Sequence, residues 1–152
     1  MKLKQKLIEL DACAPSIEWS GDMTIGEAWD KCDRGDWMLW YYATVYPENI
    51  RELTLAKGHC ANTVRHLMKD QRSIDAVDAA IAFGEGKISR EEFIEKCADA
   101  DAYAAVSYAS YAATVSSAYA DLFAADEADA IYAKRKNQQQ TADICRKYLK
   151  LD

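Results

Sequence analysis

Alanine dominates one stretch in the second half of the chain. Residues 98–133 contain 15 Ala among 36 residues, with five Tyr interleaved. Alanine is the strongest intrinsic helix former, so this stretch is predicted to be helical. As one helix, residues 90–133 would be about 66 Å long, because each residue adds about 1.5 Å. A compact domain of this size has a diameter of roughly 38 Å, so we predict a turn between about Thr114 and Asp121 that gives an Ala/Tyr-rich antiparallel pair of helices.

Short-range signals divide the remaining chain into helices. Two capping boxes, in which Glu follows Thr or Ser by three positions, predict helix starts at Thr24 and Ser89. The predicted N-cap of the helix over the aromatic run DWMLWYYATVY is Asp36, and that of a later helix is Asp70 or Ser73. We predict helices over 25–32, 37–46, 48–69 and 74–83, followed by a C-terminal helix that ends near Leu149.

The fold class follows from patterning and composition. Polar and apolar residues nowhere alternate over more than about four positions, as a β-strand would require. Apolar residues make up 50% of the chain, and it contains only six Gly and two Pro, which is unlike a disordered chain or a turn-rich β-sandwich. We therefore predict an all-α protein, a single domain over residues 1–152. It would be a bundle of about six helices, with residues 1 to about 20 at its periphery.

The sequence predicts a soluble cytoplasmic protein. No stretch approaches the roughly 20 consecutive apolar residues that a membrane span needs, so we expect no membrane partner. The N-terminus begins with the basic residues of a signal peptide. However, Lys4, Lys6 and Glu9 interrupt the apolar segment that a signal peptide needs.

The formal net charge of −6 narrows the classes of partner. Nucleic-acid binding needs a basic face that displaces counterions from phosphate, so we expect no nucleic-acid partner. Opposite fields speed protein association, and the acidic chain is therefore suited to a basic protein partner. A stripe of small residues from Ala98 to Ala120 predicts close helix packing inside the bundle, with a homodimer interface as the alternative.

Few residues could support metal binding or nucleophilic catalysis. No CxxC pair occurs among the five cysteines, and we expect them to be small buried side chains. His59 and His66 are seven residues apart, not at the i, i+4 spacing of helical metal pairs. Residues 84–93, GEGKISREEF, match neither a Ca²⁺ loop nor a phosphate loop, because apolar residues occupy required positions. We predict no metal and no cofactor, and a Cys–His pair assembled in space stays open as an alternative.

Two groups of residues are candidate binding sites, an acidic cluster in the second half and a mixed group beside the aromatic run. The acidic cluster, which is a solvated helix face or a docking patch for a basic partner, consists of Asp121, Asp126, Glu127 and Asp129. The mixed group consists of Asp33, Arg34, Asp36 and Trp37. Trp37, Trp40 and Tyr41 share one helix face by their i, i+3, i+4 spacing, so the simplest interpretation places them in the core. Trp and Tyr are also enriched in binding hot spots, which makes an interface the alternative.

Four segments occur in the order found in a known family. They are CDRGDWMLWYYA (32–43), residues 57–93 with a D-x-R-S step and a G-x-I-x-x-E-E turn, the Ala/Tyr-rich half, and QQQTADICRKYL (138–149). From about Thr24 onward the chain therefore resembles the Imm-5-like immunity protein family. The resemblance implies an all-helical cytoplasmic protein of bacteria and their phages, named for protecting the host cell from a toxin. It implies no particular catalytic residues.

The sequence thus predicts a protein that binds another protein and is not an enzyme. We expect an immunity-type protein that neutralises a toxin by stoichiometric occlusion, in which a rigid helical face with acidic groups covers a basic or catalytic surface. The first alternative is a phage-encoded inhibitor of a host defence protein, which would bind in the same way to a different target. The second is a Cys/His-dependent hydrolase.

Overall fold

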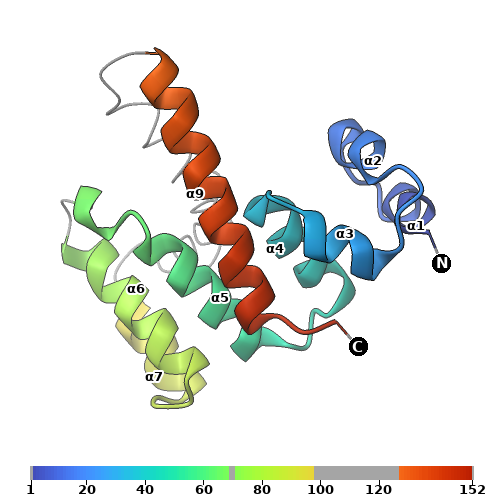
Figure 1. Cartoon of the computed structure of the whole chain (residues 1–152). Helices are drawn as coiled ribbons and strands as arrows, with labels where there is room; N and C mark the ends of the chain where they lie inside the picture. Colours follow the sequence, from blue (N-terminus) through green and yellow to red (C-terminus); the bar gives the residue numbers. More distant parts are fainter. Residues whose placement is uncertain (1, 69–70, 98–126, 152) are drawn as a thin grey trace. The chain divides into compact units, whose positions relative to one another are not determined.

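The computed structural model describes residues 2–68, 71–97 and 127–151. These residues form eight α-helices and one 3₁₀-helix (Figure 1), and within them no strand occurs, only an isolated bridge between Lys2 and Thr24. The all-α prediction is confirmed, although the helices are more numerous than expected. The predicted bend between Thr114 and Asp121 lies outside the described residues. Within the described ranges, no helix is both long enough and apolar enough to cross a membrane.

The chain forms two compact units, one from residues 1–32 with 150–152 and the other from residues 33–149. The first unit contains the short helices α1 (Leu3–Glu9), α2 (Ala14–Ser20) and α3 (Ile25–Lys31). The capping box that begins α3 is formed as predicted. The Thr24 hydroxyl accepts the Glu27 N–H at 3.3 Å, and the Glu27 carboxylate accepts the Thr24 N–H at 2.8 Å.

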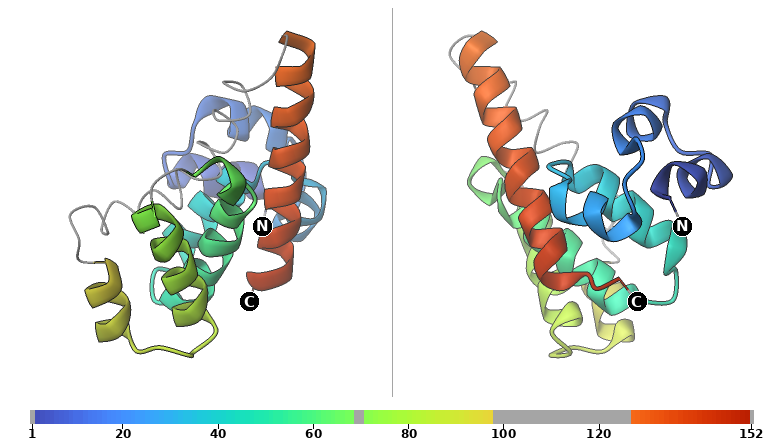
Figure 2. Two further views of the ribbon diagram at one scale, coloured as in Figure 1. Left: turned by 90° about the vertical axis from the view of Figure 1, so that its left-hand side faces the viewer. Right: turned by 45° about the vertical axis from the view of Figure 1, so that its right-hand side comes forward.

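The second unit is built around one central helix. Its elements are α4 (Gly35–Val45), α5 (Ile50–Asn62), the 3₁₀-helix η1 (Arg65–Leu67), α6 (Gln71–Gly84), α7 (Arg90–Cys97) and α9 (Glu127–Tyr148). Helix α5 packs against α6 and also against α4 and α9, and α7 packs against α6 (Figure 2). The C-terminal helix ends one residue before Leu149, as predicted.

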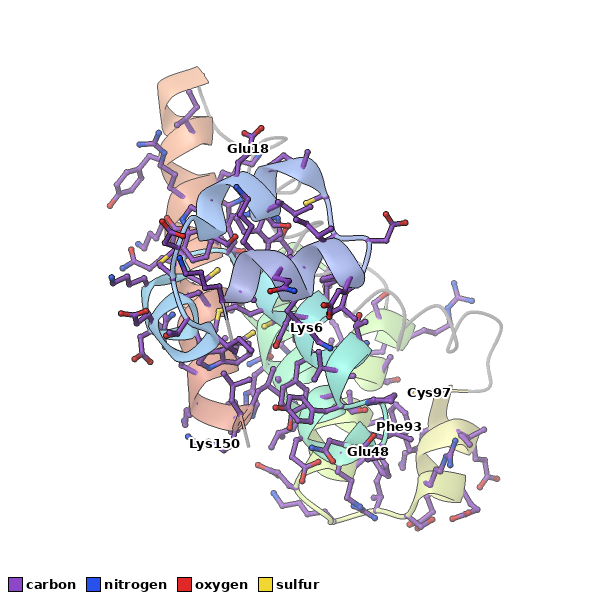
Figure 3. All side chains as sticks on the ribbon, turned by 90° about the vertical axis from the view of Figure 1, so that its right-hand side faces the viewer. Lys6, Glu18, Glu48, Phe93, Cys97 and Lys150 are labelled. Atoms are coloured by element: carbon purple, nitrogen blue, oxygen red, sulfur yellow. The ribbon has the colours of Figure 1, made fainter. Side chains whose placement is uncertain are left out.

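The apolar core of the second unit includes a cluster between α6 and α7. It consists of Ala79, Ala80, Phe83, Phe93 and Cys97. The Phe83 and Phe93 rings are stacked with their centres 5.0 Å apart, and Phe93 and Cys97 bring α7 against α6 (Figure 3). The predicted capping box places α7 at this position, because Ser89 Oγ accepts the Glu92 N–H at 3.1 Å and the Glu92 carboxylate accepts the Ser89 N–H at 2.7 Å.

Helix α5 is shorter than predicted. The apolar pattern predicts one helix over 48–69, but α5 ends at Asn62 and a separate 3₁₀-helix follows. The cause is local competition for backbone carbonyls. The Thr63 hydroxyl and the Thr63 N–H both bond to the Cys60 carbonyl, at 2.7 Å and 3.2 Å, and the Val64 N–H bonds to Ala61. These i, i+3 bonds tighten the last turn and end the α-helix.

The predicted N-cap Asp36 is wrong, and Ser73, one of the two alternatives predicted for a later helix, is excluded. Helix α4 begins at Gly35, so Asp36 lies in its first turn. There the Asp36 carboxylate accepts a hydrogen bond from the Arg34 guanidinium. A carboxylate held by a guanidinium is not available to cap the backbone N–H groups. Ser73 lies inside α6, which begins at Gln71. The other predicted cap of that helix, Asp70, is outside the described residues.

Candidate functional site

The start of α4 brings together three of the predicted binding residues, Arg34, Asp36 and Trp37. The Arg34 guanidinium donates two hydrogen bonds to the Asp36 carboxylate, from Nε at 2.9 Å and from Nη2 at 2.6 Å. Its Cζ lies 4.4 Å from the centre of the Trp37 ring, a cation–π geometry. A guanidinium bound in this bidentate way is fixed in orientation. The ring, the cation and the carboxylate therefore form one ordered cluster, beside which Asp33 is exposed.

Close contact with α9 fixes the position of this cluster. A Cβ atom added to Gly35 would lie 2.6 Å from Thr141 Cβ and 2.7 Å from the Thr141 carbonyl carbon. The Cys145 thiol also donates to the Gly35 carbonyl, at 3.7 Å. Thr141 and Cys145 are fully buried. The first turn of α4 thus lies directly on the backbone of α9, and any other residue at position 35 would separate the two helices.

Helix α9 is in turn attached to α5 by a row of small and polar side chains. Asn137, Thr141 and Cys145 recur every four residues and so lie on one helix face. The Asn137 amide donates to the Thr63 hydroxyl at 3.0 Å, and the Cys60 thiol donates to the Thr141 carbonyl at 3.8 Å. Because these hydrogen bonds are directional, they fix the position of α9 along α5. The first turn of α4 packs against the same face of α9, since Gly35 contacts Thr141 and Cys145.

The aromatic run of α4 divides between two faces. Met38, Leu39 and Tyr42 are almost completely buried, and Tyr41 is 7% exposed. Trp40 is 39% exposed and Trp37 is partly buried. The core interpretation is therefore confirmed for Tyr41 and wrong for Trp40. Because the run is apolar on all sides of the helix, the spacing of its residues does not predict which face is buried. Gly35 determines the buried face, since only the side of α4 that carries this glycine can approach α9 closely.

We use the name α4 face for the outward group that results from this arrangement. It consists of Arg34, Asp36, Trp37 and Trp40. Trp40 is one turn beyond Asp36 and Trp37, so it extends the ordered cluster along the helix. The sequence named three of these four residues. No local signal in the sequence locates the fourth, Trp40, because its outward position depends on the tertiary contact between Gly35 and Thr141.

The acidic cluster lies largely outside the part of the chain that the structure describes. Asp121 and Asp126 lie outside the described residues. Glu127 and Asp129 are in the first turn of α9, and their side chains are not among those described. The prediction that these four carboxylates form a docking patch therefore stays a prediction.

The cysteines are mostly buried, as expected. Four of the five are buried, whereas Cys13 is exposed, which corrects the expectation for that residue. Cys60 and Cys145 donate to backbone carbonyls, and burial raises the pKa of the Cys97 thiol. A nucleophilic cysteine needs a lowered thiol pKa instead. Within the described residues, no group of three His, Cys, Asp or Glu side chains could hold a metal ion.

The histidines lie in different surroundings. His66 is exposed in η1. The His59 ring of α5 stacks on the Tyr148 ring at the end of α9, with ring centres 4.5 Å apart and planes at 2°. A catalytic Cys–His pair would instead require the imidazole to lie within hydrogen-bonding distance of a thiol.

Comparisons of the chain with protein-family models, with curated proteins and with solved structures gave no match.

Proposed function

We propose that this protein is an immunity-type protein that binds a protein toxin and neutralises it by stoichiometric occlusion, without catalysis. The α4 face is the proposed contact surface. The observation that carries the proposal is the ordered Arg34–Asp36–Trp37 cluster, which is fixed on α9 through Gly35 and continues into the exposed ring of Trp40. The resemblance to the Imm-5-like family supplies the expectation that the partner is a toxin.

The composition of the α4 face suits a binding surface. Trp and Arg are the residue types most enriched in binding hot spots, because they bury a large area with few rotatable bonds or bond in a fixed geometry. Arg34 is already held by Asp36 and by the Trp37 ring. Its side-chain entropy is therefore lost on folding and not on association, which lowers the free-energy cost of binding.

Charge supports a basic partner. The chain carries a formal net charge of −6, and Asp33 is exposed directly before the cluster. The net negative charge of the chain would attract a basic toxin surface at long range. At contact, a cationic side chain of the toxin could stack on the exposed Trp40 ring. The association rate should then fall as the salt concentration rises.

The same face would serve a phage-encoded inhibitor of a host defence protein, since the two functions differ in target and not in mechanism. Among the described residues, no observation favours the hydrolase, because the thiols of Cys60 and Cys145 bond to backbone carbonyls and His59 stacks on a tyrosine.

The proposal is tested by capture of the partner with matched variants. The wild-type protein, immobilised in moderate salt, should retain one dominant basic protein in near-equal amount from a lysate of the cognate bacterium. Trp40→Ala should weaken the affinity for the purified partner about 30-fold, the effect of a hot-spot residue worth about 2 kcal/mol. The control is Ile94→Ala, which removes an exposed apolar side chain of α7. Equal affinity of the two variants for the partner would exclude the α4 face as the contact surface.

A further inference from the structure

One side of α9 is apolar over a greater length than α4 and α5 cover. Ala142 and Cys145 lie on this side, and both are 0% exposed. Ile131 lies eleven residues before Ala142, which is about three helical turns, so its side chain projects from the same side of the helix. Ile131 is nevertheless 49% exposed. The apolar side of α9 therefore continues beyond the contacts that bury the second half of the helix.

The first half of α9 is exposed along most of its described length. Tyr132, next to Ile131, is 68% exposed, and the side chains of residues 134–136 are exposed as well. This half of the helix extends past the ends of α4 and α5 (Figure 2). Apolar side chains gain free energy when they leave water, so Ile131 and Tyr132 favour a segment that covers them.

Residues 98–126 have the composition of such a segment. They connect α7 to the start of α9, so both of their ends join helices of the second unit. They are rich in Ala and Tyr, and Leu122 and Phe123 come shortly before α9. The largest apolar side chains of this stretch are therefore close in sequence to Ile131.

Charge favours the same pairing. Residues 98–126 contain four Asp and no Lys or Arg, whereas Arg135 and Lys136 are exposed on α9, one turn beyond Ile131 and Tyr132. The two surfaces are thus electrostatically complementary. A second copy of the chain would have to approach against its own net charge of −6, while a tethered segment is present at a high effective concentration.

We propose that the face of α9 around Ile131 is the docking surface for residues 98–126 of the same chain. Leu122 and Phe123 cover Ile131, and acidic residues of the segment face Arg135. Few residues separate the two contacting parts, so closing the connection between them costs little entropy. The docked stretch belongs to the same cooperative unit as α9.

Hydrogen exchange of the full-length protein tests the docking. In the wild type, amides within residues 98–126 and within 131–136 should exchange more slowly than in an unfolded chain. Ile131→Asp places a negative charge on the apolar face, beside an acidic segment. It should speed the exchange of both stretches by about tenfold or more. The Leu149 amide, which bonds to the Cys145 carbonyl, should keep its protection.

The matched control is Ile94→Asp, because Ile94 is on α7 and is 55% exposed. This variant should leave the exchange of residues 98–126 unchanged. Ile131→Ala should speed that exchange by a smaller factor, and it decides the case if Ile131→Asp also exposes Leu149. The docking is refuted if neither Ile131 variant speeds the exchange of residues 98–126, or if Ile94→Asp speeds it equally. Loss of wild-type protection on dilution would also refute it, since a second copy would then cover α9.

Discussion

The α5–α6 interface and the α4–α9 interface both depend on glycine, but the residues that meet the glycine differ in character. At the α5–α6 interface a Cβ on Gly84 would lie 2.7 Å from Leu55 Cα, and one on Gly58 would lie 2.9 Å from Ile81 Cγ1. Buried Ala61 and Val77 pack beside them. At the α4–α9 interface, Gly35 instead meets Thr141 and the thiol of Cys145.

This difference shows how two kinds of contact contribute differently to one fold. Apolar contacts at the α5–α6 interface are non-directional, so they favour close approach without strongly fixing the position along the helix. The hydrogen bonds from Asn137 to Thr63 and from Cys145 to Gly35 have defined partners. A shift of α9 along its axis would leave these buried groups unsatisfied, at a cost of about 1–3 kcal/mol each. The polar interface therefore places the start of α4, on which the α4 face depends.

The largest expected effect comes from adding one carbon atom to either interface. Gly35→Ala and Gly84→Ala should each lower the free energy of unfolding by about 1–3 kcal/mol, because the new Cβ collides with backbone atoms of the facing helix and not with a flexible side chain end. Chemical denaturation measures both values. Only Gly35→Ala should also weaken partner binding, since it displaces Arg34 and Trp37, whereas Gly84 is at the interface that does not carry the α4 face.

Gly26→Ala is the matched control for these two variants. Gly26 is in α3, and a Cβ there would meet nothing within 4 Å. The substitution should stabilise the protein by about 0.5–1 kcal/mol, because alanine favours the helix. If Gly35→Ala and Gly26→Ala had the same stability, α4 and α9 would not approach as closely as the structure shows.

A smaller effect, the coupling free energy between Asn137 and Thr63, tests the polar contact that attaches α9 to α5. Asn137→Ala and Thr63→Ala should each cost about 1 kcal/mol, and the double variant should cost less than their sum by about 0.5–1.5 kcal/mol, because both remove the same 3.0 Å hydrogen bond. Asn137→Ala combined with Ser89→Ala, which removes a distant capping box, should be additive. Additivity in the first pair would mean that the Asn137–Thr63 bond does not contribute to the attachment of α9.

Local structure was predictable from the sequence wherever the determining residues are close in the chain. The capping boxes at Thr24 and Ser89 each need two side chains three residues apart, and both form as predicted. The end of α6 at Gly84 follows from a local helix stop. Such signals do not depend on what the helix later packs against.

The end of α5 and the division of the α4 faces were not predictable in this way. Helix α5 ends where the Thr63 hydroxyl donates a hydrogen bond to the Cys60 carbonyl. The same hydroxyl accepts a hydrogen bond from Asn137, 74 residues further along the chain. The segment QQQTADIC resembles an exposed helix by composition, yet its Thr141, Ala142 and Cys145 are fully buried. The sequence named Arg34, Asp36 and Trp37 as site residues. It could not show that Gly35 turns Trp40 outward, because that depends on the tertiary contact with Thr141.

The smallest expected effect is a difference in the local opening of the two interfaces, which the cysteines report. Cys13 is exposed and the other four cysteines are buried, so a thiol reagent should modify one cysteine rapidly in the folded protein. Cys13→Ser should abolish that fast phase.

Peptide mapping then measures the slower labelling of the four buried cysteines. Gly35→Ala should speed the labelling of Cys145, which bonds to Gly35, more than that of Cys97 between α6 and α7. Equal acceleration of labelling at Cys145 and Cys97 would mean that the second unit opens as a whole. A second rapidly labelled cysteine in the wild-type protein would favour the hydrolase alternative.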